Sequence, residues 1–418
     1  MNSKKKETFV KALTKHQIFK RLNKVTTMLP PPDKFTNRLQ HTKDVVDVAG
    51  FIEENVINRY KIKRIYNFAE SCYVHDIGHC CFAHESEEVI NDFIAEQLCV
   101  TKDEVCFSHA VNGALVLACA AKPNRIYTDL SKLDLFKKNE KNIDVQMIID
   151  SMIKHSFKDY YIKGIYFKYI DDEYFYKTNK HIFIFKEKDK KPLFPVGYYV
   201  RVADDIASKN SDVLDISHLY YGNIISKPTT VTINDQYYIV AKKYIKQLDL
   251  EASTTYKNFK IEDTFNNLDL YKKQKELLKL TYKFDYKKQF TTRVQGILKE
   301  ILNMVCENPI ILRKCGFSRK YAGLRRVFLR SVKRIDIKQE MNNYTISLVK
   351  KRFYDDPYNL TSEYYMVYHR YICAIAYQIS NLTDIDFIKL INHKVCFCKL
   401  TKTSKENALW LKKKYRIK

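Results

Sequence analysis

The chain has 418 residues, of which 45% are hydrophobic and 29% are charged, so it can bury one large core or two to three smaller ones and is not a disordered chain. The 73 lysines and arginines outnumber the 48 aspartates and glutamates, and the formal net charge of +25 predicts attraction to polyanions such as nucleotides, DNA or RNA. A second explanation stays open, because a composition rich in Lys, Asn, Ile and Tyr also follows from an AT-biased genome, and lysine runs are usually solvated faces.

Only nine glycines and nine prolines interrupt the chain, which favours long helices over a β fold with many turns. The 11 cysteines form an odd-numbered set without regular spacing, as expected for reduced thiols in a cytoplasmic protein. The basic start leads into polar sequence, and the longest run of small apolar residues, 114–121, is far too short to span a membrane. We therefore expect a cytoplasmic protein with no membrane contact.

The N-terminal half predicts a series of helices. We expect them over residues 19–29, 38–52, 60–75, 89–98, 109–121, 147–153 and 195–219. The first ends at three consecutive prolines, which cannot continue a helix. His41 lies near the start of the second, whereas His75 and Asp76 come at the end of the third.

Polar side chains also mark the later helices of this half. Ser108 is the expected N-cap of the helix over 109–121, and His155 follows the helix over 147–153. Asp204 and Asp212 are eight residues apart within the last helix, so they lie on one face about two turns apart.

The rest of the chain is more basic. Residues 160–195 alternate aromatic and charged side chains, which predicts a hairpin or short helices with an aromatic face, and 229–240 alternate as strands do. Charged helices are expected from about 263 to 352. Basic side chains recur there at helical spacing, at Arg319, Lys320, Arg325, Arg326, Arg330, Lys333 and Arg334. This stripe is either a solvated helix face or a surface for phosphates, single-stranded DNA or RNA. The predicted fold is mainly α with small β hairpin elements.

The densest chemistry lies in one segment, His75-Asp76-Ile77-Gly78-His79-Cys80-Cys81-Phe82-Ala83-His84-Glu85-Ser86-Glu87. An adjacent His and Asp offer one nitrogen and one oxygen ligand to a divalent metal. If the segment is helical, His75 and His79 share a face. A polar helix start that carries histidines by chance is the plainer alternative.

Four residues at element ends, His41, His75, Asp76 and Asp204, make a ligand set that leaves positions open on a six-coordinate Mn, Fe or Mg ion. A hydrolase needs such an open position. His79 and His84 would lie beyond these ligands, where an imidazole can contact phosphate or move a proton. Glu87 is three residues from His84 and could orient it. Structural zinc is not expected, because no cysteine cluster accompanies the histidines.

The order His41, His75-Asp76 and Asp204 resembles the HD phosphohydrolase superfamily. The motif His-Asp-Ile-Gly-His-x-x-Phe-x-His-x-x-Glu is similar to the deoxyguanosine triphosphate triphosphohydrolase (dGTPase) branch. Other stretches resemble that branch in the same order, at 19–26, 38–41, 107–109, 195–207 and 212–215 and, more weakly, at 307–309 and 382–384. The resemblance implies an HD-domain helical core in residues 1–222 and a mostly helical, basic C-terminal extension in 223–418.

The resemblance implies metal-dependent hydrolysis of a deoxynucleoside triphosphate (dNTP) to deoxynucleoside and inorganic triphosphate, by a homo-oligomer. Its metal, Mn2+, Mg2+ or Fe2+, would be held by His41, His75, Asp76 and Asp204.

The resemblance also implies roles for the neighbouring side chains. His84 with Glu87 would be the catalytic pair, and His79 and His109 would lie near the phosphates. Water would attack the α-phosphorus, and His84 or His109 would give a proton to the leaving 5′ oxygen. Arg38 would meet the triphosphate, and Asp212 would lie at the 3′ side of the sugar.

The chain departs from the dGTPase pattern near the nucleoside. Ser208 stands where the family has a tyrosine that packs against deoxyribose, and Thr27 replaces a glutamine. The usual Pro-Pro of the central motif is Cys80-Cys81, and a C-terminal aspartate is Tyr377. Sugar and base preference therefore stay open. So do two other functions, namely another HD phosphohydrolase (a nucleotidase or single-strand nuclease) and a nucleic-acid-binding protein with an inactive metal site.

Overall fold

The computed structural model describes residues 13–15, 17–27, 30–54, 67–120, 145–155, 165–166, 196–221, 285–308, 310–315 and 363–417. Most of the segments predicted as hairpins or strands, and the basic stripe over 319–334, lie outside these described residues.

Helices dominate the described residues, which confirms the mainly α prediction. They are α2 (Gln17–Lys20), the 3-10 helix η1 (Arg21–Lys24), α3 (Arg38–Ile52), α4 (Phe68–Val74), α5 (His84–Leu98), α6 (Lys102–Val105), α7 (His109–Ala120), α9 (Val145–Lys154), α11 (Val196–Tyr221), α15 (Asp285–Glu307), α16 (Ile310–Lys314), α20 (Glu363–Ser380), α21 (Asp384–Asn392), α22 (Lys394–Phe397) and α23 (Lys402–Lys414). The β contact that occurs in this part of the chain is an isolated bridge between Thr26 and Asn37.

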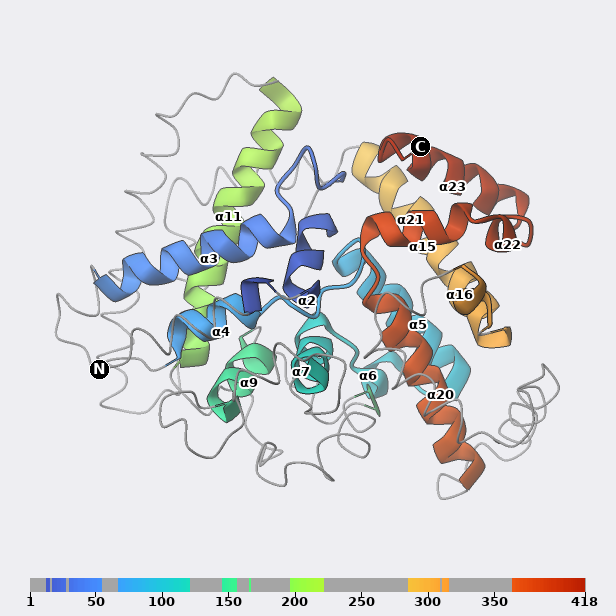
Figure 1. Cartoon of the computed structure of the whole chain (residues 1–418), viewed down its shortest axis with the longest axis horizontal. Helices are drawn as coiled ribbons and strands as arrows, with labels where there is room; N and C mark the ends of the chain where they lie inside the picture. Colours follow the sequence, from blue (N-terminus) through green and yellow to red (C-terminus); the bar gives the residue numbers. More distant parts are fainter. Residues whose placement is uncertain are drawn as a thin grey trace.

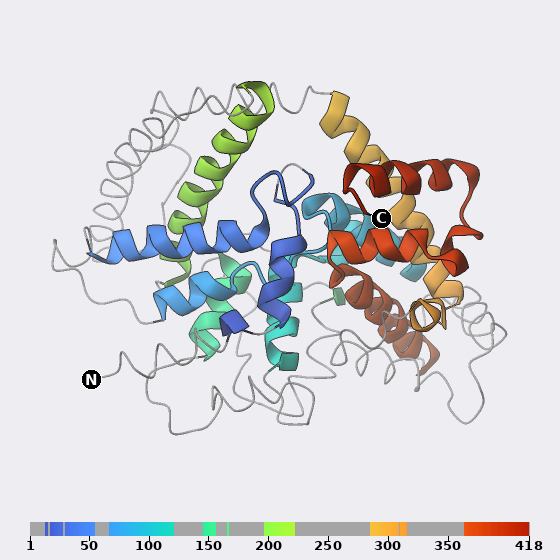
Figure 2. The same ribbon diagram turned by 45° about the horizontal axis from the view of Figure 1, so that its top comes forward.

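Two groups of helices meet at the segment that joins α4 to α5. On one side α3 packs across α11 and α4, and α9 packs against α4, α7 and α11 (Figure 1). On the other side α5 packs against α15 and α20, while α23 covers α15 and α21 (Figure 2). One apolar core includes side chains from both groups, such as Val74, Ile90, Ile148, Leu298 and Ile375. None of the described helices is long and apolar enough to cross a membrane.

The segment 75–87 is not a continuous helix, so the expected shared face of His75 and His79 is wrong. Helix α4 ends at Val74 and α5 begins only at His84. Phe82 and Ala83 have φ angles of 59° and 53°, in the left-handed region that interrupts a helix. The helix predicted over 19–29 is also too long, because its 3-10 end stops at Lys24 and Thr26 pairs with Asn37.

Gly78 explains how the loop between α4 and α5 can approach α7. A Cβ atom at Gly78 would lie 2.1 Å from the backbone nitrogen of Gly113 and 2.1 Å from the carbonyl oxygen of His109. A side chain is therefore sterically excluded at this position. The close contact brings His79 against His109, whose rings stack with centroids 3.9 Å apart.

Asp384, at the start of α21, holds the same loop from the other side. Its Oδ1 accepts a hydrogen bond from the Phe82 amide at 2.8 Å, and its Oδ2 accepts from the Thr26 amide at 3.1 Å. The hydroxyls of Thr26 and Tyr415 also donate to Oδ2, at 2.5 and 3.1 Å. One buried carboxylate therefore joins the N-terminal segment, the loop before His84 and the C-terminal helices.

Replacing Asp384 by alanine should destabilise the fold by at least about 3 kcal/mol, because buried donors lose a charged acceptor. Urea unfolding followed by circular dichroism measures this change. Lys389→Ala, at an exposed position of the same helix, should change stability by less than about 0.5 kcal/mol. Equal stability of the two variants would contradict the role of Asp384.

Asp215 of α11 anchors the segment that leads into α3. Its Oδ1 accepts hydrogen bonds from the amide and the hydroxyl of Thr36, both at 2.9 Å. Its other oxygen, Oδ2, is buried and makes no hydrogen bond to a described residue. Burial raises the pKa of Asp215 from 3.8 to about 6 despite the two bonds from Thr36.

Asp215→Asn should therefore stabilise the protein by about 1 to 3 kcal/mol at pH 7.5, because the amide oxygen keeps both bonds and no charge is buried. Since the folded-state pKa lies above the unfolded one, the wild type loses stability as pH rises from about 4 to about 6. The difference in unfolding free energy between Asp215→Asn and the wild type should therefore shrink as pH falls from about 6 to about 4. Denaturation curves at pH 4.5 and 7.5 test this, and a difference that does not vary with pH would refute it.

Candidate functional site

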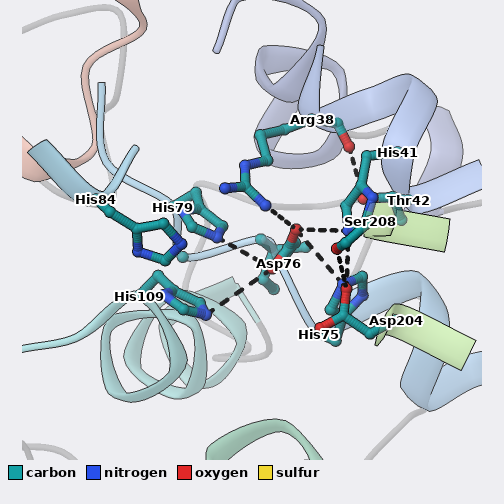
Figure 3. Close-up of polar contacts among 12 residues, drawn as sticks. Arg38, His41, Thr42, His75, Asp76, His79, His84, His109, Asp204 and Ser208 are labelled. Carbon is teal, nitrogen blue, oxygen red and sulfur yellow. Dashed lines mark hydrogen bonds and ion pairs between the residues drawn. The ribbon is translucent and has the colours of Figure 1, made fainter. Parts of the chain in front are cut away.

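Four predicted ligands meet where α3, α4 and α11 converge (Figure 3). His41 Nε2 lies 3.0 Å from Asp204 Oδ1 and 3.4 Å from Asp76 Oδ2. His75 Nε2 lies 3.4 Å from Asp76 Oδ2 and 3.5 Å from Asp204 Oδ1. Two imidazole nitrogens and two carboxylate oxygens thus face one point, although they come from three separate segments of the chain. His41, His75, Asp76 and Asp204 are called the first cluster.

The tautomer of His75 suits a metal ligand. Its Nδ1 lies 2.7 Å from the carbonyl oxygen of Cys72 and donates to it, so in the neutral ring, the form that binds a metal, the lone pair is on Nε2. This buried Nε2 makes no hydrogen bond to a described residue. Burial lowers the affinity of His75 for a proton, but Asp76 and Asp204 raise its pKa to about 9. The carboxylates therefore attract a cation to this nitrogen, and His41, His75 and Asp204 could hold a metal ion.

A second histidine cluster lies on the other side of Asp76 and surrounds Glu87. Glu87 Oε1 is 2.7 Å from His109 Nδ1 and 3.5 Å from His84 Nδ1. Burial alone would raise the pKa of Glu87, but these two rings hold it well below its usual range. Partial loss of solvent around His84 disfavours its protonated form, and the Glu87 charge nevertheless raises the pKa of His84. The His84 side chain is 63% exposed, which suits a group that exchanges protons with a ligand.

Asp76 joins the two clusters. Its Oδ2 faces the first cluster, whereas its Oδ1 lies 3.2 Å from His79 Nε2 and 3.9 Å from His109 Nε2. Arg38 adds a hydrogen bond from Nη1 to Oδ2 at 2.9 Å. Burial alone would raise the pKa of Asp76, but the surrounding imidazoles and guanidinium hold it well below its usual range, so Asp76 is a carboxylate. Burial lowers the pKa of His79 well below its ordinary value, and this ring is neutral.

Both clusters open into one cavity of about 790 Å³, a size typical of small-ligand sites. Its described acidic lining consists of Asp76, Glu85, Glu88, Asp204, Asp205 and Asp212. Its described basic lining, apart from histidines, consists of Arg38, Arg201 and Lys288. The cavity is therefore acidic when its histidines are neutral, although the whole chain carries a charge of +25.

The structure places the remaining predicted substrate contacts at this cavity. Ser208, Asp212 and Thr27 all line it. Ser208 donates a hydrogen bond to Asp204 Oδ1 at 3.2 Å, and Thr27 donates to the carbonyl oxygen of Thr36 at 2.5 Å. Asp204 and Asp212 share a face of α11, as their spacing predicts.

Some lining residues are missed by sequence reasoning. The sequence marks His155 only as a polar residue at a helix end, yet its ring lies 5.6 Å from that of His75, centroid to centroid. Helix α15 contributes Lys288, Thr291, Thr292 and Gln295 to the lining. Their spacing defines one face of a helix, but any solvated helix has such a polar face. Only the packing of α15 on α5 shows that this face borders the cavity.

Comparison with models of known protein families and with curated proteins finds no match to this chain.

Mn2+ should bind metal-free protein and raise its melting temperature, since an ion that binds only the folded state stabilises it by about 2.7 kcal/mol at 100 times its dissociation constant. Asp204→Asn should lose at least half of that shift, because it removes an anionic ligand. Thermal unfolding with and without MnCl2 measures this effect, with His393→Gln, at the start of α22, as the matched control. Equal shifts in the wild type and Asp204→Asn would exclude a metal at the first cluster.

Proposed function

We propose that this protein is a metal-dependent phosphohydrolase that converts a dNTP to deoxynucleoside and inorganic triphosphate. The observation that carries the proposal is one cavity that contains a metal-capable cluster, a carboxylate-supported histidine and nearby cationic side chains. Metal ligands, a proton donor and phosphate contacts are the groups that phosphate-ester hydrolysis requires. The resemblance of the segment 75–87 to the dGTPase branch supports the choice of substrate.

The first cluster fits a divalent metal, because imidazole nitrogens and carboxylate oxygens converge there and His75 Nε2 is buried without a hydrogen bond to the described residues. When bound, such an ion supplies Lewis-acid polarisation of a phosphoryl oxygen. His41, His75, Asp76 and Asp204 would hold it.

The other side chains have distinct roles in the proposal. Arg38 and Lys288 bind the triphosphate oxygens, since both are cationic and line the cavity. His84 donates a proton to the leaving 5′ oxygen, because its side chain is accessible and the adjacent carboxylate favours its protonated form. Glu87 orients this ring and keeps the cationic form stable during the transfer.

The nucleoside end of the substrate would lie along α11. Asp212 is assigned to the 3′ hydroxyl of the sugar, and Ser208 and Thr27 line the same cavity with hydroxyl groups. These small side chains leave room beside the sugar, so a ribonucleotide panel belongs in any substrate test.

Purified protein with Mn2+ or Mg2+ should release tripolyphosphate and deoxynucleoside from at least one dNTP, as measured by anion-exchange chromatography over all eight nucleotides. His84→Gln should lower kcat by about 10²- to 10⁴-fold, the usual contribution of a general acid. His393→Gln should retain wild-type activity, since His393 lies in the C-terminal helices and does not line the cavity.

Other products would support one of the alternative functions. Release of orthophosphate alone would indicate a nucleotidase, and cleavage of single-stranded oligonucleotides that His75→Ala abolishes would indicate a nuclease. Salt-sensitive DNA binding that survives His75→Ala and Asp204→Ala, without any hydrolysis, would indicate a nucleic-acid-binding protein.

A further inference from the structure

The stretch of α11 that follows Asp204 lines the cavity with small polar side chains. Ser208, Ser211 and Asp212 continue the face of the helix on which Asp204 lies. With the rise of an α-helix, Ser208 lies about 6 Å and Ser211 about 10 Å past Asp204 along the helix axis. All of the described residues that line the cavity are polar or charged, so aliphatic, phenyl, phenol and indole side chains are absent from this described lining.

Ser211 has a buried hydroxyl group without a partner. The residue is only 3% exposed, and its Oγ makes no hydrogen bond to a described residue although Ser211 lines the cavity. Ser208, one turn earlier, donates to Asp204 Oδ1 at 3.2 Å, and its oxygen can still accept (Figure 3). A buried hydroxyl without a partner has a free-energy cost that a ligand group can offset. The two serines therefore suit a ligand that carries hydroxyl groups of its own.

The charges around the cavity indicate which part of a nucleotide lies along this stretch. Asp212 places a carboxylate at its far end, and Arg201 is already paired with Asp205, at 3.6 Å. Arg38 and Lys288 belong instead to α3 and α15. Since carboxylates repel phosphates, the triphosphate lies toward those two cations and the neutral nucleoside lies toward Asp212. The sugar, which follows the α-phosphate directly, then faces the serine hydroxyls of α11.

The described lining of this stretch has no means to reject a 2′ hydroxyl. Selection against an added hydroxyl requires a bulky side chain in its place, or an apolar wall that leaves it without a partner. Ser208 and Ser211 are small and can pair with it. Asp212 has two carboxylate oxygens, and a carboxylate is the group that binds the ribose 2′ hydroxyl in many dinucleotide sites. A ribose can therefore occupy this position with both of its hydroxyls paired.

We propose that the protein also cleaves ribonucleoside triphosphates, and that Ser208, Ser211 and Asp212 bind the sugar together with its 2′ hydroxyl. This inference rests on the proposed triphosphohydrolase function and adds a substrate class to it. The oxygen of water forms a bond to the α-phosphorus, and the bond from the α-phosphorus to the 5′ oxygen breaks. The 5′ oxygen keeps the electron pair of that bond and takes a proton from His84, which one proton of the attacking water replaces. The products are a ribonucleoside and inorganic triphosphate.

The test compares each ribonucleotide with its 2′-deoxy counterpart, in the presence of Mn2+, by release of tripolyphosphate. For at least one base, the wild type should cleave the ribonucleotide with a kcat/KM no less than about one tenth of that for the dNTP. Ser208→Leu should lower this ratio by about tenfold or more, because an apolar side chain beside the sugar leaves the 2′ hydroxyl without a partner.

Ser211→Ala should lower the same ratio by about fivefold, the contribution of one hydrogen bond. Ser71→Ala is the matched control. Ser71 is also buried and its Oγ likewise makes no hydrogen bond to a described residue, but Ser71 does not line the cavity. Its ratio should equal that of the wild type.

A wild-type ratio below about one tenth for every base would overturn the inference. So would a ratio that Ser208→Leu and Ser211→Ala both leave unchanged. If neither variant folds, as judged by circular dichroism, the wild-type ratio decides alone. Cleavage of dNTPs without cleavage of ribonucleotides would overturn this inference only, whereas no tripolyphosphate from either class would overturn the proposed function with it. Cleavage of ribonucleotides alone would support the inference and contradict the dNTP as substrate.

Discussion

The site depends on one buried carboxylate. Asp76 is surrounded by four imidazoles and a guanidinium, and these neighbours stabilise its ionised form, because burial alone disfavours the charge. Its neighbours come from α3, from the loop after α4 and from α7. Each of these elements must therefore be correctly packed before the charge is compensated. The chemistry of the site and the packing of the fold are linked through this single group.

The loop that carries Asp76 is held in place by contacts from other parts of the chain. Gly78 contacts the backbone of Gly113 so closely that no side chain fits, and Arg21 donates to the carbonyl oxygens of Ile77 and His79 at 2.6 and 2.9 Å. Asp384 accepts a hydrogen bond from the amide of Phe82, which is 302 residues away in the chain. The left-handed backbone at Phe82 and Ala83 would be costly in a free peptide. Contacts from both ends of the chain offset that cost and set the direction in which His84 enters α5.

Sequence reasoning found most of the site because its ligands lie next to predictable helix ends. His41 lies near the start of an amphipathic helix, and His75 and Asp76 follow a buried one. These polar residues interrupt an apolar pattern and can therefore be recognised in the sequence. The loop conformation was not predictable, since a dense polar segment fits a helix by composition alone. His155 was placed beside His75 only by the packing of α9 on α4. Long-range packing carries information that local periodicity does not contain.

The opposite signs of the whole chain and of the cavity have a consequence for the proposed substrate. Surface lysines attract a triphosphate over roughly one Debye length, about 8 to 10 Å, but inside the cavity the nearest charges dominate. Those charges are mostly carboxylates, so the metal-free cavity repels the same anion that the surface attracts. A divalent cation at His41, His75, Asp76 and Asp204 would reduce this repulsion, whereas Arg38 is already paired with Asp76. Metal binding would then have to precede nucleotide binding, and the basic surface would raise the encounter rate without deciding which molecules enter.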